Sequence, residues 1–208
     1  MHEDALSAGQ RRALLALTPI AERGFYLAGG SALCLRLAHR QSIDLDLFHT
    51  GQFDAEELLR DLRAAGIPLH EAAVQRSAVW FELEGVETSL LYFDHPPLHP
   101  VELSLGIPVA SLADIAAMKV EAIASRGARK DFVDLYFICQ EPEFDLAAAL
   151  DAFQARFASA KPDVLHRVKA LTYFEDAELE PELLLLRQVA WRDVKAFFER
   201  EVTRWWQR

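Results

Sequence analysis

The chain has 208 residues, of which 51% are hydrophobic and 26% charged, and its formal net charge is -10. This composition supports one sizeable core or a domain with a helical extension, and it excludes a disordered chain. The acidic balance also excludes a protein that coats nucleic acid through a general excess of Lys and Arg, although it leaves room for a local basic patch.

The first predicted elements are a helix, a short strand and a second helix. Residues 5–19 have helical periodicity, and Pro19 is expected to close or to bend that helix. Residues 25–28 are apolar and predict a buried strand. Gly29-Gly30 then permits a tight turn, and Ser31 is expected to cap a helix that runs to about Leu37.

A second strand and another helix follow, and after them the hydrophobic pattern changes from helical to strand periodicity. Residues 42–48 alternate as a half-buried strand does, and residues 54–65 predict an amphipathic helix. Two runs with the pattern of strands, 79–83 and 86–92, flank Glu84-Gly85 and predict a hairpin.

Beyond Pro108 the sequence predicts helices only. They are expected at 111–125, 129–139, 145–158, 162–170 and 182–206. We therefore predict an α+β protein in which a small mixed sheet flanked by helices is followed by a helical region. The expected domains are residues 1–108, an α+β core, and residues 109–208, a helical region packed on it.

Two carboxylates on the second strand are the first functional candidates. Asp44 and Asp46 are two residues apart, so a strand places both on one face. Two carboxylates so close repel each other and persist best with a cation between them, and Mg²⁺ shares such ligands with substrate phosphates. A chain of this composition contains about one Asp-x-Asp pair by chance, so the pair needs its setting to be informative.

That setting is the Gly29-Gly30-Ser31 turn, 13 residues before Asp44. A helix that begins after two glycines offers free N–H groups and a positive dipole end to a phosphate. A turn and cap without any ligand is the alternative. Together the turn and the Asp pair indicate nucleotidyl transfer, with divalent metal stabilising the attacking oxygen and the pyrophosphate leaving group.

The run from Gly29 to Leu33, with His39-Arg40-x-Ser42-Ile43-Asp44-Leu45-Asp46-Leu47-Phe48, resembles the nucleotidyltransferase superfamily. More narrowly, it is similar to the AbiEii/AbiGii (MenT-like) toxin family of bacterial type IV toxin–antitoxin systems. Two further stretches carry the same resemblance, residues 113–119 around Lys119 and the block Lys130-Asp131-Phe132-x-Asp134-Leu135-Tyr136. The resemblance covers roughly residues 24–140.

The resemblance implies roles for individual residues. It implies nucleotide contacts from Gly29, Gly30, Ser31, Arg40, Ser42 and Lys119. It implies catalytic roles for Asp44, Asp46, Lys119, Asp131 and Asp134, of which Asp44 and Asp46 bind the metal. From the residues alone, Lys119 could instead be a surface side chain, and Asp131 and Asp134 could form a salt-bridged face with Arg129 and Lys130.

The family's third carboxylate is displaced in this chain. The aligned position on the later strand is Ser89, and Glu87, two residues earlier on the same face, is the candidate metal ligand in its place. A surface-facing Glu87 is the alternative reading.

The expected function is Mg²⁺- or Mn²⁺-dependent transfer of an NMP from an NTP to a hydroxyl of RNA, tRNA or protein, by a toxin with a cognate antitoxin. A small-molecule acceptor, as in antibiotic-type nucleotidyltransferases, and a degenerate nucleotide-binding or interaction module are the two alternatives. No apolar run reaches membrane-spanning length and no signal peptide pattern is present, so we expect a cytoplasmic protein without membrane contact.

Overall fold

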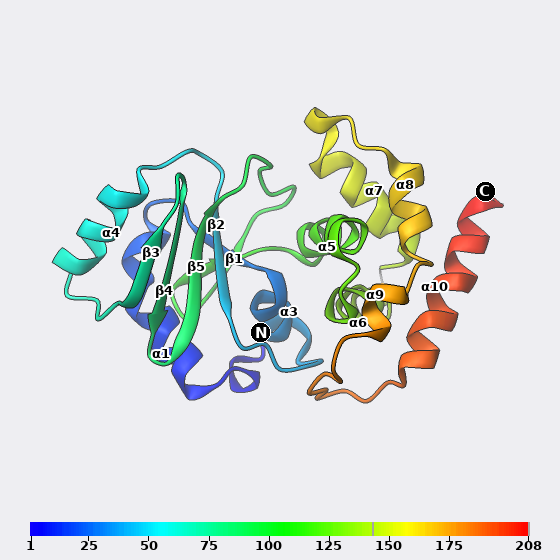
Figure 1. Ribbon diagram of the computed structural model, residues 1–208, viewed down its shortest axis with the longest axis horizontal. Coiled ribbons are helices and arrows are strands. Elements are labelled where there is room, and N and C mark those ends of the chain that lie inside the picture. Colours follow the sequence, from blue (N-terminus) through cyan, green and yellow to red (C-terminus); the bar gives the residue numbers. More distant parts are fainter. Residues whose placement is uncertain (143, 208) are drawn as a thin grey trace. The chain divides into compact units, whose positions relative to one another are not determined.

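The computed structural model describes residues 1–142 and 144–207 (Figure 1). Internal contacts divide the chain into two compact units. Unit 1 contains Met1–Arg36 and Ser42–Ser111, and unit 2 contains Leu37–Gln41 and Leu112–Arg208. The five residues from Leu37 to Gln41 therefore belong to unit 2, although both of their chain neighbours belong to unit 1.

Unit 1 is built on a seven-stranded mixed sheet with the order β3-β4-β5-β2-β1-β7-β6. The strands are β1 Tyr26–Ala28, β2 Leu45–His49, β3 His70–Val74, β4 Ala78–Leu83, β5 Val86–Tyr92, β6 Glu102–Ser104 and β7 Ile107–Val109. The pairs β2–β5 and β1–β7 are parallel, and the other pairs are antiparallel. The predicted hairpin is confirmed as β4–β5, with positive φ at both Glu84 and Gly85 as a tight hairpin turn requires.

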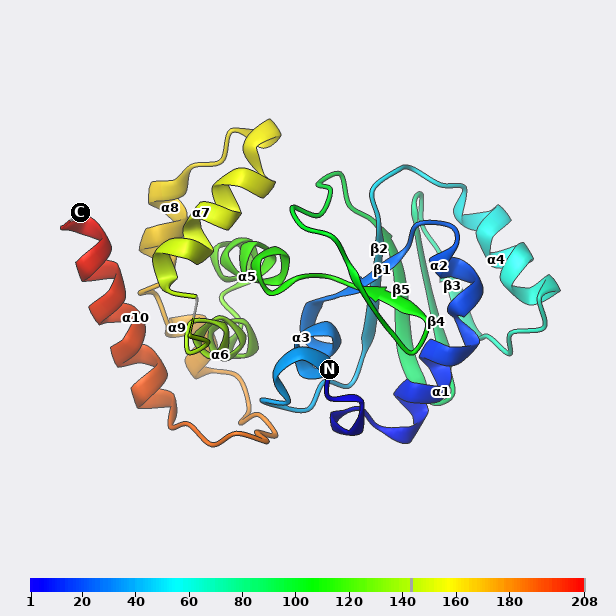
Figure 2. The same cartoon turned by 180° about the vertical axis from the view of Figure 1, so that it is seen from behind.

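Helices flank this sheet, which confirms the predicted fold class. They are α1 Ala8–Ala16, α2 Thr18–Ala21, α3 Gly29–Leu37 and α4 Ala55–Ala64. The bounds of the first predicted helix, residues 5–19, are wrong: α1 begins after the Ser7 cap and ends at the Leu17 cap, and the short helix α2 continues through Pro19. Helices α1, α2 and α4 lie on one face of the sheet and α3 on the other (Figures 1 and 2).

The two faces of the sheet differ in burial. Leu45, Leu47, Val79 and Leu90 are fully buried on the face that α1 and α4 cover. A Cβ built at Gly9 of α1 would lie 3.2 Å from Val86 Cγ2, so the helix backbone approaches this face closely. The residues that alternate with these apolar positions lie on the other face, which is more exposed.

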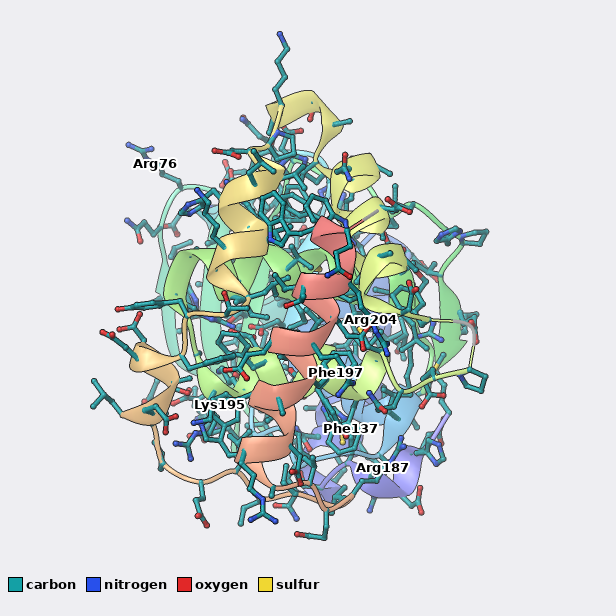
Figure 3. The ribbon with its side chains drawn as sticks, turned by 90° about the vertical axis from the view of Figure 1, so that its right-hand side faces the viewer. Arg76, Phe137, Arg187, Lys195, Phe197 and Arg204 are labelled. Atoms are coloured by element: carbon teal, nitrogen blue, oxygen red, sulfur yellow. The ribbon has the colours of Figure 1, made fainter. Side chains whose placement is uncertain are left out.

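Unit 2 is helical. Its helices are α5 Leu112–Arg126, α6 Arg129–Ile138, α7 Leu146–Arg156, α8 Val164–Ala170, α9 Glu175–Glu178 and α10 Trp191–Trp206. Aromatic side chains join α6 and α10, since Tyr136 and Phe197 have ring centroids 5.3 Å apart. Figure 3 shows α10 from outside, and the Arg187 guanidinium lies over the Phe137 ring, 5.0 Å from its centroid.

One predicted helix is corrected. Residues 182–190 do not form the first part of the helix expected at 182–206 but run extended before α10. Leu185 forms a β-bridge with Arg40, and the backbone N–H of Gln41 donates to the carbonyl of Leu184 at 2.9 Å. This pairing satisfies backbone groups that a helix would otherwise pair internally, so tertiary contact outweighs the helix propensity of the four leucines.

No helix in the described part of the chain is long and apolar enough to cross a membrane.

Candidate functional site

The Asp pair lies at the start of β2. Asp46 is within the strand and Asp44 directly precedes its first residue, Leu45. Leu45 and Leu47 are fully buried, whereas Asp44 and Asp46 are half-buried. This alternation agrees with two carboxylates on the face opposite the α1 and α4 layer.

The carboxylate of Asp46 lies against the glycine turn. Ala28, the last residue of β1, is the register partner of Asp46. Gly29 follows with φ +70°, and a Cβ placed on it would lie 3.3 Å from Asp46 Oδ2. Only glycine meets both conditions without strain, so this turn lets the carboxylate approach the N-terminus of α3, where the helix dipole favours negative charge.

Ser31 does not act as the expected cap, because α3 begins two residues earlier, at Gly29. Its side chain is buried, and its hydroxyl donates to the backbone carbonyl of Asp44. Gln10 of α1 reinforces this contact: its Nε2 lies 3.3 Å from Ser31 Oγ and donates to the carbonyl of Ser42 at 2.9 Å. Ser31 thus ties the first turn of α3 to the segment that carries the Asp pair.

Within residues 1–142 and 144–207, no third carboxylate forms a metal-binding group with the pair. Ser89 of β5, the residue that the sequence comparison places at the third carboxylate position, is the register partner of Asp46. Glu87 is exposed and lies opposite Glu82 of β4. Among the described residues, no group of three or more His, Cys, Asp or Glu side chains could hold a metal ion.

Two carboxylates still fit one kind of metal site. Mg²⁺ is commonly held by one or two carboxylates together with waters and substrate phosphates rather than by a cage of protein ligands. Asp44 and Asp46, beside a helix N-terminus that suits phosphate, provide that donor set. Ser42 Oγ donates to Asp44 Oδ1 at 3.1 Å, which orients one of the two carboxylates.

The remaining predicted residues meet in unit 2 as a buried charged network. Asp134 of α6 accepts from Arg40 Nε at 2.6 Å and from Arg40 Nη2 at 2.7 Å, a two-point contact. Lys119 Nζ of α5 lies 2.8 Å from Asp131 Oδ1 and 2.6 Å from Asp134 Oδ2. The His39 ring completes the set, with Nε2 2.7 Å from Asp134 Oδ1.

Arg126 is the exposed edge of this network. It contacts Asp131 through Nε at 2.7 Å and Nη2 at 2.9 Å, while 54% of its side chain remains exposed. By contrast, the side chains of Asp131 and Asp134 are fully buried and that of Lys119 nearly so. The salt-bridged alternative for the two Asp residues is therefore what the contacts show, with Lys119, Arg40 and Arg126 as partners instead of Arg129 and Lys130.

The network keeps its members charged despite burial. Burial alone would raise the pKa of the Asp134 carboxyl, but Lys119 and Arg40 outweigh it and hold that pKa well below its usual range. Burial likewise opposes the charge on Lys119, and the two carboxylates raise its pKa above the ordinary value. His39 is the exception, because burial lowers its pKa in spite of Asp134.

Sequence reasoning identified Arg40, Lys119, Asp131 and Asp134 but missed their mutual pairing and the part that His39 plays. Arg40 and Asp134 are 94 residues apart, and only their opposite charges hinted at contact. The pairing anchors residues 39–41 on α6, and the chain then runs directly into Ser42 and Asp44.

A parallel β2–β5 pair, a glycine turn at the start of a helix and an Asp pair beside it define a protein of the nucleotidyltransferase type. The family model described as nucleotidyl transferase AbiEii toxin, type IV toxin–antitoxin system, matches residues 12–79 and 74–207. The chain belongs to this family.

Individual proteins are similar to this chain in sequence or in fold. The chain is 34% identical over 182 residues to the uncharacterized protein aq_aa25 of Aquifex aeolicus (strain VF5), covering 86% of each. Its fold is similar to JHP933 from Helicobacter pylori, with TM-score 0.57, 18% identity and coverage of 95% of this chain and 92% of the other. It is also similar to MenT4, a nucleotidyltransferase toxin from Mycobacterium tuberculosis H37Rv, with TM-score 0.56, 17% identity and coverage of 94% and 84%.

Proposed function

We propose that this protein is a Mg²⁺- or Mn²⁺-dependent nucleotidyltransferase. It would move an NMP from an NTP to a hydroxyl group of an RNA, such as tRNA, or of a protein, and release pyrophosphate. The observation that carries the proposal is the approach of Asp46 to Gly29, which brings a carboxylate and a helix N-terminus to one place.

Each part of unit 1 has a task in this proposal. Backbone N–H groups at Gly29, Gly30 and Ser31 would bind the phosphates of the NTP, because the first N–H groups of a helix have no partner within it. Asp44 and Asp46 would hold the divalent metal, which neutralises charge on the reacting phosphate and on the leaving group. Ser42 and Ser31 would keep the Asp44 segment in place through the bonds described above.

Lys119, Asp131 and Asp134 enter the proposal as positioning residues. Lys119 Nζ is engaged by two carboxylates and is nearly inaccessible, so its support for catalysis would pass through the network. Arg40 is engaged in the same way by Asp134. By fixing residues 39–41, the network would control the backbone that leads to Ser42 and Asp44.

A cognate antitoxin is the expected partner in the cell, because the family consists of toxins of type IV toxin–antitoxin systems. The acceptor could also be a small cationic molecule, which the net charge of -10 and the acidic residues Glu82 and Glu87 on the Asp face favour. Ser89 at the third carboxylate position favours the remaining alternative, a module that binds NTP without turnover.

One assay separates these functions. The protein is incubated with each labelled NTP, Mg²⁺ and total tRNA, with the double variant Asp44→Ala/Asp46→Ala as the control. We expect label on tRNA with the wild-type chain and none with the double variant. Label transfer that survives the double substitution would refute the mechanism, and NTP binding without transfer to any acceptor would favour the inactive module.

A further inference from the structure

The face of the sheet that carries Asp44 and Asp46, here called the Asp face, extends across the neighbouring strands. The register partners Ala28, Asp46, Ser89, Trp80 and Ala73 follow one another across β1, β2, β5, β4 and β3. Residues that are directly opposite in neighbouring strands point to the same face. The Trp80 side chain therefore shares a face with Asp46, two strand spacings away, or about 10 Å between the two backbones.

Trp80 is unusually open for a residue of a central strand. It is 38% exposed, whereas its chain neighbours Val79 and Phe81 are buried on the other face. Its direct cross-strand neighbours are both small, Ser89 on β5 and Ala73 on β3. Aromatic residues in sheets are normally stabilised by bulky cross-strand partners. Here small partners leave the indole ring accessible.

The geometry of an in-line displacement indicates which of the two substrates, the NTP or the acceptor, lies near the Trp80 ring. In an in-line displacement, the attacking oxygen and the leaving pyrophosphate are on opposite sides of the reacting phosphorus. In the proposed function, the pyrophosphate is bound at the glycine turn that begins at Gly29, on the β1 side of Asp46. The attacking hydroxyl must then approach from the β5 side, over Ser89 and toward Trp80.

We propose that Trp80 is the stacking platform for the acceptor, and that the acceptor presents a nucleobase next to its reactive hydroxyl, as the terminal nucleoside of an RNA does. This inference rests on the proposed function and adds the acceptor subsite to it. An exposed indole binds any base through its π-face, so the subsite holds the terminal nucleoside without reading its sequence. The distance from Asp46 suits a reacting phosphate followed by one nucleoside.

The acidic residues nearby narrow the acceptor further. Glu82 and Glu87 lie on the same face and diagonal to Ser89 and Trp80, respectively. Two carboxylates repel a phosphate backbone that runs along the face. The subsite therefore fits a chain end, with one nucleoside on Trp80 and the remaining phosphates directed away from the sheet.

The test compares three variants of the full chain in steady-state transfer to total tRNA. Trp80→Ala should raise the KM for tRNA about 5- to 100-fold, the range that loss of one stacked base implies, and leave the KM for the NTP unchanged. Trp80→Phe, which keeps a ring, should return the KM for tRNA to within about threefold of the wild-type value. Trp206→Ala, which removes another exposed indole from the end of α10, is the matched control and should change neither constant.

A binding measurement separates this inference from the function on which it rests. Total tRNA without NTP should quench the fluorescence of the wild-type chain, and Trp80→Phe should remove that quench. Transfer by the wild type with no effect of Trp80→Ala on the KM for tRNA overturns the platform and leaves the function. Quenching through Trp80 without transfer overturns the function and leaves the platform. A change in the KM for NTP alone means that Trp80 holds the NTP base instead, and neither quench nor transfer rejects both proposals.

Discussion

Unit 1 and unit 2 use the same residue types in opposite ways. In unit 1, Asp44 and Asp46 are half-buried beside a helix N-terminus, and their side chains face an accessible side of the sheet. In unit 2, Asp131 and Asp134 are fully buried, and every carboxylate oxygen has a cationic partner within 3 Å. Carboxylates that bind a transient metal need access, whereas carboxylates that hold helices together need permanent partners. The comparison therefore separates the proposed metal ligands from the proposed positioning residues by their environment.

The largest expected effect is on activity, from Asp46→Asn. If the Asp pair holds the metal as proposed, losing one of the two carboxylates should lower kcat/KM by about 10³-fold or more, because the charge that stabilises the transition state is no longer held in place. The free energy of unfolding should change little. Transfer assays and urea unfolding measure the two effects, and Asp61→Asn on the surface of α4 is the control for loss of a carboxylate. A variant that loses stability together with activity would show that Asp46 is structural.

The opposite outcome is expected for Asp134→Asn. This change leaves Arg40 and Lys119 buried with one negative charge fewer, and breaking such a buried pair costs about 3–5 kcal/mol of folding free energy. Urea unfolding should show this loss at neutral pH, with Asp44→Asn as the matched control that leaves the network intact. An Asp134→Asn protein that unfolds like the wild type but loses transfer would instead assign Asp134 to catalysis.

The comparison also explains how much could be predicted from the sequence. The glycine turn and β2 follow from local patterns, because turn chemistry and alternation are set by neighbouring residues. The strands β6 and β7 were missed, since three residues are too few to show a period. The strand β3, with the polar run His70-Glu71 at its start, was also missed.

Contacts between residues far apart in the chain were the main feature that could not be predicted from the sequence. The extended course of residues 182–190 depends on pairing with His39 and Arg40, about 145 positions earlier in the chain. The burial of Lys119 likewise depends on Asp131 and Asp134, and from the residues alone Lys119 could equally have been a surface side chain. Family resemblance singled these residues out, but only the structure shows that they are paired with one another and buried.

The network predicts a specific loss of stability in acid. The unfolded chain protonates His39 as the pH falls through about 6.5, while burial keeps the folded imidazole neutral to lower pH. The carboxyls of Asp131 and Asp134 have lowered pKa values in the folded protein, so below about 4 the unfolded chain again binds more protons. Protons therefore favour unfolding in both ranges, and stability should decline in two steps from neutral pH.

Urea unfolding at a series of pH values measures this decline. The variant His39→Gln, which can still donate to Asp134, should remove the step that begins near pH 6.5 and retain the one below about pH 4. Equal slopes for wild type and variant in the upper range would assign that step to other groups.

A smaller effect is expected from Gly29→Ala, and a second glycine provides its control. Gly29 and Gly85 have nearly the same φ, +70° and +74°, but a Cβ at Gly85 would meet nothing within 4 Å. Both alanine variants should lose about 1 kcal/mol of stability from backbone strain. Only Gly29→Ala should also lower kcat, by about 10- to 100-fold, because its Cβ displaces the Asp46 carboxylate. Equal activity in the two variants would mean that the close approach of Gly29 to Asp46 is not needed for transfer.

The smallest expected effect tests why the third carboxylate position holds serine. Ser89→Asp places a third negative charge in register with Asp46, which should cost about 0.2–1 kcal/mol without metal, since like charges oppose each other across neighbouring strands. Added Mg²⁺ should then raise the Tm of Ser89→Asp by more than it raises that of the wild type or of the uncharged control Ser89→Asn. A Tm that does not depend on metal in any of the three proteins would mean that the Asp pair binds metal only together with the NTP phosphates. In that case the substrate supplies the missing ligands, and Ser89 does not weaken metal binding by the free protein.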